Sequence, residues 1–156
     1  YSNEYGLSRV RAMFPYALGD KPTERGYPCF RLKEMPETLD MGGGLKISSA
    51  ELPHGSIQTL GLVFECGGKR FAYYTDCKSL TPRAEELAAD ILAVDCLRLK
   101  PHPSHMTLDE ALAVVEKLSP KLAFFTHTTS HIDYGKIERS LPKNCHIAYD
   151  GLTVEI

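Results

Sequence analysis

The stretch Arg70-Phe71-Ala72-Tyr73-Tyr74-Thr75-Asp76-Cys77 decides how the rest of the chain is organised. Its apolar and aromatic run is typical of a buried strand, and the run ends at a carboxylate instead of a turn residue. An unpaired buried carboxylate costs several kcal/mol, so Asp76 needs hydrogen-bond donors or a cation, often a metal. Two other predicted strands end in a similar way, at Pro53-His54-Gly55 and at Phe124-Phe125-Thr126-His127. Three strand ends therefore offer an imidazole, a carboxylate and a second imidazole.

Composition sets the outer limits. The chain has 156 residues, of which 43% are hydrophobic, which fits one ordinary domain. Lys plus Arg number 18 against 20 for Asp plus Glu, giving a net charge of -2, and this balance argues against nucleic acid as a partner. No apolar run approaches the roughly 18 residues of a membrane span, and no signal peptide is recognisable. The five cysteines form no Cys-x-x-Cys pair, and we expect reduced thiols in a cytoplasmic protein.

The chain starts at Tyr1 without methionine, and we expect residues 1–156 to be a single-domain fragment of a longer protein. Residues 1–45 are expected to be irregular, as a lid over a substrate or as a plain connection. Within them, the segment 7–18 predicts a short helix that Ser8 caps and Pro15 ends.

From Leu45 onward the pattern predicts strands first and then alternating helices and strands. Strands are predicted at 45–52, 57–66, 71–74, 91–95 and 122–126, with Gly67-Gly68 as a tight hairpin turn. Thr81-Pro82 is typical of a helix start, and Thr107 with Glu110 predicts a capping box for a second helix that Pro120 closes. A polar helix is predicted at about 133–140, and a terminal hairpin is predicted to pair 146–149 with 152–156 across Asp150-Gly151.

This order of elements predicts a layered α/β domain, of the α+β type, with helices on one outer face of a mixed sheet. The other face of the sheet must then be buried against something else. The asymmetry indicates half of a larger sandwich.

The three strand-end residues suit a metal site. The carboxylate of Asp76 can bridge two divalent cations, and the imidazoles of His54 and His127 suit zinc, manganese or iron. Each has an ordinary structural interpretation as well. His54 could be a turn residue, Asp76 a helix-capping acid near Thr81, and His127 a hydrogen-bonded core histidine.

Two more histidines lie in the segment 101–107, just before the helix that Thr107 opens. At a helix N-terminus, His105 is suited to bind a phosphoryl oxygen and to give a proton to a leaving alkoxide. His102 is either a second substrate-binding group or a surface residue between prolines.

Five motifs, in their order along the chain, resemble the second half of the metallo-β-lactamase-fold hydrolases. They are Pro53-His54-Gly55, Ala72 to Cys77, Pro101 to Ala111, Phe125-Thr126-His127 and Ala148 to Leu152. Among these the match is closest to the phosphoribosyl cyclic phosphodiesterase branch. The resemblance implies an αββα sandwich that holds two divalent metal ions (Zn or Mn, or Fe). It also implies that His54, Asp76 and His127 are metal ligands, with Asp76 as the bridge, and that His105 contacts the substrate phosphate.

The chain departs from this family pattern in two ways. The family's first metal motif, His-x-His-x-Asp-His, is absent, and His131 follows His127 at a spacing that leaves the role of His131 open. Because two metal ions need about six or seven protein ligands, we expect these 156 residues to bind metal poorly and to be inactive without the missing N-terminal half of the fold. The sequence is compatible with a homodimer.

The activity implied for the intact protein is metal-dependent hydrolysis of a small or cyclic phosphodiester, with a small phosphorylated substrate as the partner. Three alternatives stay open at this point: transfer-RNA 3′ processing on the same fold, a non-catalytic binding module, and nucleophilic catalysis by Cys77. The near-neutral charge argues against the first, and no base that would activate the thiol is recognisable for the third.

Overall fold

The computed structural model describes residues 1–19, 26 and 28–155. It divides the chain into two compact units, Tyr1–Pro36 and Glu37–Ile156. Parts of the segment 1–45, at 20–25 and 27, lie outside the described residues, as does residue 156.

In the first unit, α1 (Glu4–Met13) is followed by the 3-10 turn η1 (Pro15–Ala17). The helix begins earlier than predicted, because Asn3 and not Ser8 is its cap. The Asn3 side chain accepts from the Gly6 amide at 2.9 Å, whereas the Ser8 hydroxyl donates to the Tyr5 carbonyl. The predicted end before Pro15 is confirmed. The segment 1–45 thus contains regular elements, and its role as a lid stays a prediction.

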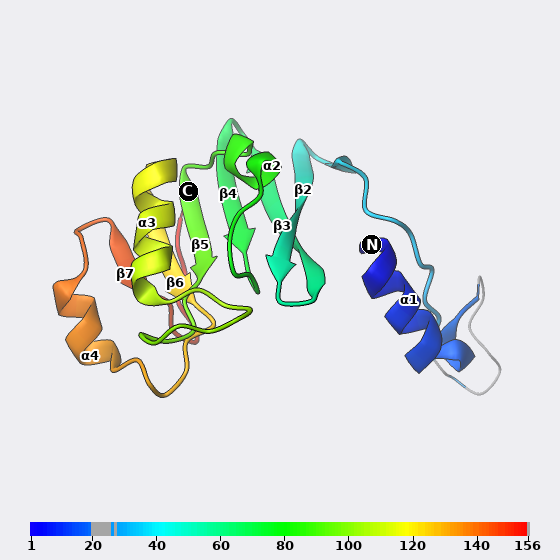
Figure 1. The fold of residues 1–156 in the computed structure, drawn as a ribbon. Coiled ribbons are helices and arrows are strands. Elements are labelled where there is room, and N and C mark those ends of the chain that lie inside the picture. The colour runs from blue at the N-terminus through cyan, green and yellow to red at the C-terminus, as the bar shows by residue number, and fades with distance from the viewer. Residues whose placement is uncertain (20–25, 27, 156) are drawn as a thin grey trace. The chain divides into compact units, whose positions relative to one another are not determined.

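The second unit carries the sheet. Its elements are β1 (Thr38–Gly42), β2 (Leu45–His54), β3 (Ile57–Cys66), β4 (Lys69–Tyr74), α2 (Pro82–Glu86), β5 (Ile91–Asp95), α3 (Leu108–Leu118), β6 (Leu122–Thr126), α4 (Tyr134–Ile137), the 3-10 turn η2 (Glu138–Ser140) and β7 (Cys145–Ile147). In the described residues these strands form one sheet of seven in sequence order. Figure 1 shows β2 to β7 in that order across the sheet. The pairs from β1 to β4 are antiparallel, and those from β4 to β7 are parallel.

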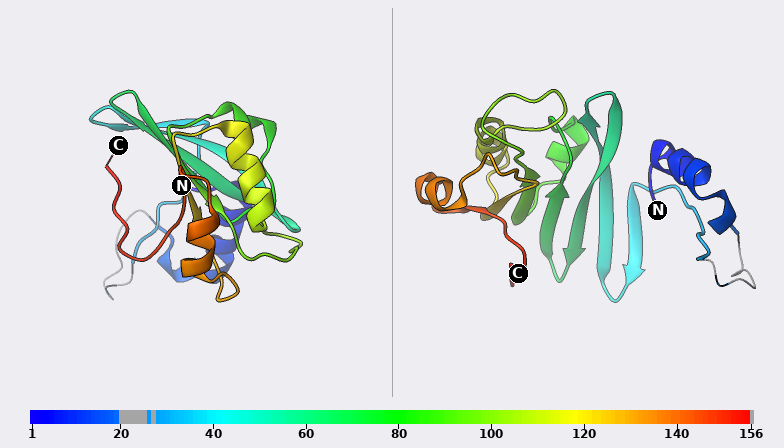
Figure 2. Two further views of the ribbon diagram at one scale, coloured as in Figure 1. Left: turned by 90° about the vertical axis from the view of Figure 1, so that its left-hand side faces the viewer. Right: turned by 90° about the horizontal axis from the view of Figure 1, so that it is seen from below.

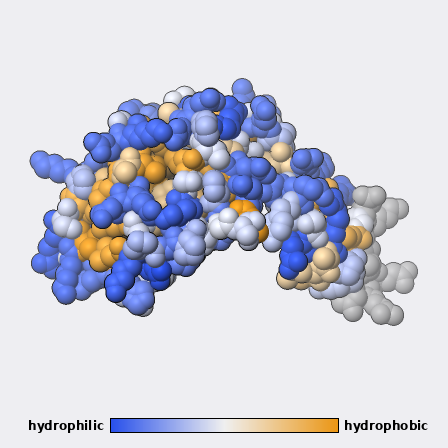
Figure 3. All heavy atoms as spheres, viewed as in Figure 1, coloured by the Kyte–Doolittle hydropathy of each residue, from blue (hydrophilic) through white to orange (hydrophobic). Residues whose placement is uncertain are grey.

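The predicted α/β class is confirmed, with helix α3 covering one face of the mixed sheet. Alternate residues of the strands pack under the helices, among them Tyr74, Val94 and Phe125, which are all fully buried. Within the described part of the second unit, the C-terminal segment packs on the opposite face through Ala148, Leu152 and Val154. Figure 2 shows α3 and this segment on opposite sides of the sheet. Figure 3, which looks onto the face that carries α3, shows apolar residues gathered around that helix within a hydrophilic rim.

The predicted terminal hairpin is wrong. β7 instead pairs in parallel with β6, from Ala123 opposite Cys145 to Phe125 opposite Ile147. The chain does turn at Asp150-Gly151, where Gly151 has a φ of 88°, but residues 152–155 form no strand. They lie across the sheet face instead, because Leu152 and Val154 bury apolar surface there against Phe124 and its neighbours.

Candidate metal and catalytic site

The topology of the sheet brings four strand ends to one edge. β2 and β4 are both antiparallel to β3, so they run in the same direction, and β5 and β6 are parallel to β4. Their carboxyl ends therefore lie at a common edge, where His54 and Asp95 are the last residues of β2 and β5. Asp76 follows two residues after β4, and His127 directly follows β6. Carboxyl ends of strands are the usual place for a site in such sheets.

The first imidazole, that of His54, is oriented through one nitrogen. Its Nδ1 lies 3.0 Å from the carbonyl oxygen of Ser104. A carbonyl only accepts, so Nδ1 carries the hydrogen, and Nε2 keeps a lone pair for another partner. Gly55 allows the approach: its φ is +63°, and a Cβ there would lie 3.2 Å from the Cβ of Ser104. Metal-binding histidines are commonly oriented by a backbone carbonyl in this way.

Asp76 and His127 face each other across the edge. The Nδ1 of His127 lies 3.4 Å from an oxygen of Asp76, and both side chains are about two-fifths exposed. The Asp76 main chain is held by the Thr59 hydroxyl, which donates to its carbonyl at 2.6 Å. His127 has a φ of 62°, a left-handed conformation that costs a non-glycine residue about 1 kcal/mol or more.

The ordinary structural interpretations of these two residues do not hold. Thr81 itself caps α2, accepting from the Ala84 amide at 3.4 Å, and Asp76 makes no such bond in the described structure. His127 is not a core histidine, because its side chain is 41% exposed.

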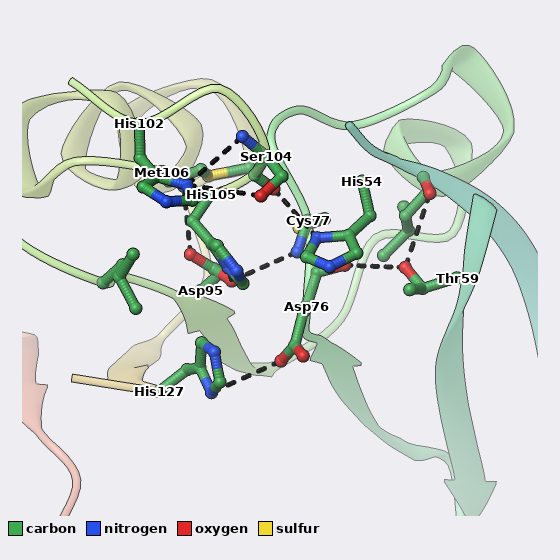
Figure 4. Close-up of polar contacts among 12 residues, drawn as sticks. His54, Thr59, Asp76, Cys77, Asp95, His102, Ser104, His105, Met106 and His127 are labelled. Atoms are coloured by element: carbon green, nitrogen blue, oxygen red, sulfur yellow. Dashed lines mark hydrogen bonds and ion pairs between the residues drawn. The ribbon is translucent and has the colours of Figure 1, made fainter. Parts of the chain in front are cut away.

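His105 lies at the centre of the group, as Figure 4 shows. Its ring centroid is 4.6 Å from that of His54 and 4.8 Å from that of His127, although His105 itself is only 8% exposed. Two residues later, Thr107 is the N-cap of α3 and forms a capping box with Glu110, which fixes the start of the helix. The structure thus brings together all three of these histidines and Asp76.

His102 lies at the rim, with its ring centroid 5.0 Å from that of His105. The amide and hydroxyl of Ser104 lie 3.3 and 3.2 Å from the His102 Nδ1. Desolvation, assisted by the positive charge of Arg98, lowers the pKa of His102. His131, in contrast, is exposed and lines a separate pocket with Arg98 and Lys100.

Asp95 belongs to the same cluster, and sequence reasoning did not include it. It is fully buried, and its oxygen Oδ2 lies 2.7 Å from the Nδ1 of His105. Ligand atoms of Asp95, His105 and His127 all lie within 4.8 Å of one another. The sequence does contain one indication of this role, because β5 ends in an acid just as the strand before Asp76 does.

Cys77 is not suited to nucleophilic catalysis. Its side chain is fully buried, and burial, together with the charges of Asp95 and Asp76, raises the pKa of its thiol to about 12. Because the thiolate is the reactive form, this alternative is removed.

A mixed sheet that brings histidines and carboxylates together at one edge is typical of proteins that bind metal ions there. Comparison with known protein families identifies the family. Residues 7–128 match the Beta-lactamase superfamily domain, and the chain belongs to that family. Its fold is of the metallo-β-lactamase type.

Three solved structures illustrate the similarity. A diphosphatase from the PhnP family is 29% identical, with a TM-score of 0.84 over 100% of this chain and 57% of its own. Zn(2+)-bound PqqB from Methylobacterium extorquens is 17% identical, with a TM-score of 0.72 over 100% of this chain and 64% of its own. Human tRNase Z, short form, is 17% identical, with a TM-score of 0.60 over 77% of this chain and 47% of its own. The last two show the fold alone.

A curated relative, the octanoyltransferase of Porphyromonas gingivalis (strain ATCC BAA-308 / W83), is 26% identical over 159 residues. The match covers 97% of this chain and 31% of the relative. The chain therefore spans about a third of this relative and a little over half of the diphosphatase.

None of the helices in the described part of the chain has the length and apolar character that a membrane span requires.

Proposed function

We propose that the intact protein is a metal-dependent hydrolase that cleaves a small or cyclic phosphodiester. In this proposal the present chain supplies part of a dinuclear metal centre and the proton donor. One observation carries it: the rings of His54 and His127 both lie within 5 Å of His105, and Asp76 lies beside His127.

The donor set fits divalent ions. His54 has its Nε2 available because Nδ1 is turned to Ser104, and Asp76 offers a carboxylate whose side chain is 39% exposed. Nitrogen and carboxylate donors together suit zinc, manganese or iron. A bound pair of such ions supplies water activation at neutral pH and stabilisation of negative charge on the phosphoryl group. His54, Asp76 and His127 are the residues of this chain that would hold them.

The remaining ligands are proposed to come from another part of the intact protein. Three protein ligands are too few for two ions. The sheet face opposite α3 supports a missing layer, since it carries a shallow, mostly apolar groove of about 350 Å³ that includes Phe71, Tyr73, Phe124 and Tyr149. An N-terminal half of the fold with the motif His-x-His-x-Asp-His would cover that face and complete the centre.

The chain's own residues account for the proton that the reaction needs. Hydrolysis adds water to phosphorus, breaks one phosphorus–oxygen ester bond, and releases an alcohol whose oxygen must gain a proton. In its protonated form His105 would give that proton from Nε2, since its Nδ1 is turned to Asp95. His102, whose ring lies 5.0 Å from that of His105, would bind a substrate oxygen.

The test uses the full-length protein from which this chain comes. Turnover of a cyclic ribose phosphate, of bis(p-nitrophenyl) phosphate and of a transfer-RNA precursor is measured side by side, together with metal content. We expect the two small phosphodiesters to be cleaved and the RNA to be left intact. Cleavage of the RNA alone would establish transfer-RNA processing, and inactivity on all three with metal absent would favour a binding module.

Variants then assign the roles. His54→Ala, Asp76→Ala and His127→Ala are expected to lose bound metal, because each removes a proposed ligand. His131→Ala is the matched control, since it removes an exposed histidine that follows His127 by four residues. Full metal content in all three site variants would contradict the proposed ligand set.

A further inference from the structure

The buried carboxylate of Asp95 receives three hydrogen bonds. Its Oδ1 accepts from the Met106 amide at 3.0 Å. Its Oδ2 accepts from the Cys77 amide at 3.1 Å and from the Nδ1 of His105 at 2.7 Å. The side chain is 0% exposed, so these three groups take the place of the water that would otherwise solvate the carboxylate.

Two roles are open to such a carboxylate. Its proximity to His105 and His127 would allow all three to bind one metal ion. A metal ligand, however, needs an oxygen lone pair turned to the ion. The Oδ2 of Asp95, which is the oxygen beside His105, already accepts two hydrogen bonds, and Oδ1 accepts a third from the Met106 amide. Similarly, the Nδ1 of His105 makes its hydrogen bond to Asp95, so only Nε2 of His105 can face the site.

We infer that Asp95 is the positioning residue of His105, and that it holds the hydrogen of the imidazole on Nδ1 so that Nε2 faces the substrate. This inference rests on the proposed function for its catalytic consequence. A carboxylate that binds the far nitrogen of a histidine fixes both the tautomer and the ring orientation.

Asp95 also sets the distance between the proton donor and the proposed bridging ligand. The Cys77 amide directly follows Asp76, and the Met106 amide directly follows His105. One carboxylate therefore ties the loop after β4 to the loop before α3. Figure 4 shows Asp95 between these two loops.

The first experiment replaces Asp95 by asparagine in the full-length, metal-loaded protein. We expect kcat for a phosphodiester with a sugar alkoxide leaving group to fall about 10- to 100-fold, with KM and metal content unchanged. Bis(p-nitrophenyl) phosphate should lose far less, because a nitrophenolate leaves without needing a proton. Combined with His105→Ala, Asp95→Asn should cause little further loss, since both act on one proton transfer.

Asp90→Asn is the matched control. Asp90 precedes the other end of β5, where it accepts from the Arg70 amide at 2.9 Å and pairs with Lys121 at 2.7 Å. The variant removes the same charge at the opposite end of β5, one residue before the strand begins, without touching the site. Circular dichroism of both variants checks that each of them folds.

The second experiment needs no activity. Nitrogen-15 NMR of histidine-labelled full-length protein should show that Nδ1 of His105 carries hydrogen in both the neutral and the protonated ring, whereas Nε2 carries hydrogen only in the protonated ring that donates it. Asp95→Asn should change the tautomer preference of the neutral ring. A neutral His105 ring that carries its hydrogen on Nε2 and none on Nδ1 would overturn the inference, as would loss of metal from Asp95→Asn. An Nδ1 hydrogen in a protein that cleaves no phosphodiester would uphold the positioning and reject the proposed function alone.

Discussion

The Nδ1 of His54 lies 3.0 Å from the carbonyl oxygen of Ser104, a residue 50 positions further along the chain. This contact joins the end of β2 to the loop that carries His102 and His105. It turns Nε2 of His54 toward the common edge of the sheet, and Gly55 makes the close approach possible.

Replacing Gly55 by alanine should therefore disturb the site. We expect a loss of about 1–3 kcal/mol in the free energy of unfolding and about tenfold weaker metal binding by the full-length protein, because a Cβ at positive φ would press on Ser104. Urea unfolding and metal titration measure the two effects. Gly67→Ala is the control, since Gly67 has a similar φ of +58° but its Cβ would meet open space. Unchanged metal affinity in Gly55→Ala would show that the contact does not orient His54.

Replacing His105 by alanine should separate chemistry from metal binding. We expect turnover of a phosphodiester by the full-length protein to fall about 10²- to 10⁴-fold, the usual contribution of a positioned acid, while metal content stays the same. Steady-state kinetics and elemental analysis provide the two readings. Equal loss of metal and turnover would indicate a ligand role for His105 instead.

The isolated chain of 156 residues should bind divalent metal weakly. It offers His54, Asp76 and His127 as ligands, which is too few for two ions. Titration of zinc or manganese into the purified chain, followed by calorimetry, measures the affinity. Tight binding of two ions per chain would contradict the expectation that a further part of the protein is needed.

Thiol reactivity should follow burial. Cys66 is exposed, whereas Cys77 and Cys96 are fully buried, and burial raises the pKa of both thiols to about 12. A thiol reagent near pH 8 should therefore modify Cys66 readily, and Cys77 and Cys96 only after unfolding. Peptide mass spectrometry identifies the modified positions. Rapid modification of Cys77 in the folded protein would reopen a nucleophilic role.

Glu110 should make stability depend on pH. Burial alone would raise the pKa of this carboxyl, but hydrogen bonds from Lys78 and Thr107 outweigh it and lower the pKa below 4.5. A lowered pKa means that the ionised form stabilises the folded state, fully above pH 4.5 and progressively less as the pH falls through the lowered value. Unfolding of wild type and Glu110→Gln should differ at pH 7 and converge in acid. A constant difference would rule out this carboxyl as the cause.

Much of the fold could be predicted because its signals are local. The strands at 57–66, 91–95 and 122–126 match β3, β5 and β6 in their bounds, and Thr107 and Glu110 do form the predicted capping box. The terminal hairpin failed because Asp150-Gly151 indicates a turn without indicating its partner. Burial of Leu152 and Val154 on the sheet face decided the path of the chain.

The site divides in the same way. His54, Asp76 and His127 could be recognised as ligand types at strand ends, and the structure brings them to one edge, although their binding of metal stays a prediction. Asp95 could not be assigned from sequence, because an acid that ends a strand looks the same whether its partner is a metal ion or an imidazole. Only the 2.7 Å contact with His105 separates these roles.

The direction of the strands also determines which loops of the domain can change in sequence and length. Every group discussed for chemistry sits at one rim, whereas the glycine turns at Gly43 and Gly67-Gly68 close the opposite rim. Loop insertions, tags or fluorescent labels grafted onto that distant rim should leave the reactive end undisturbed. The domain therefore has one edge whose turns can vary in sequence and length, and one edge where His54, Asp95 and His105 are held by hydrogen bonds.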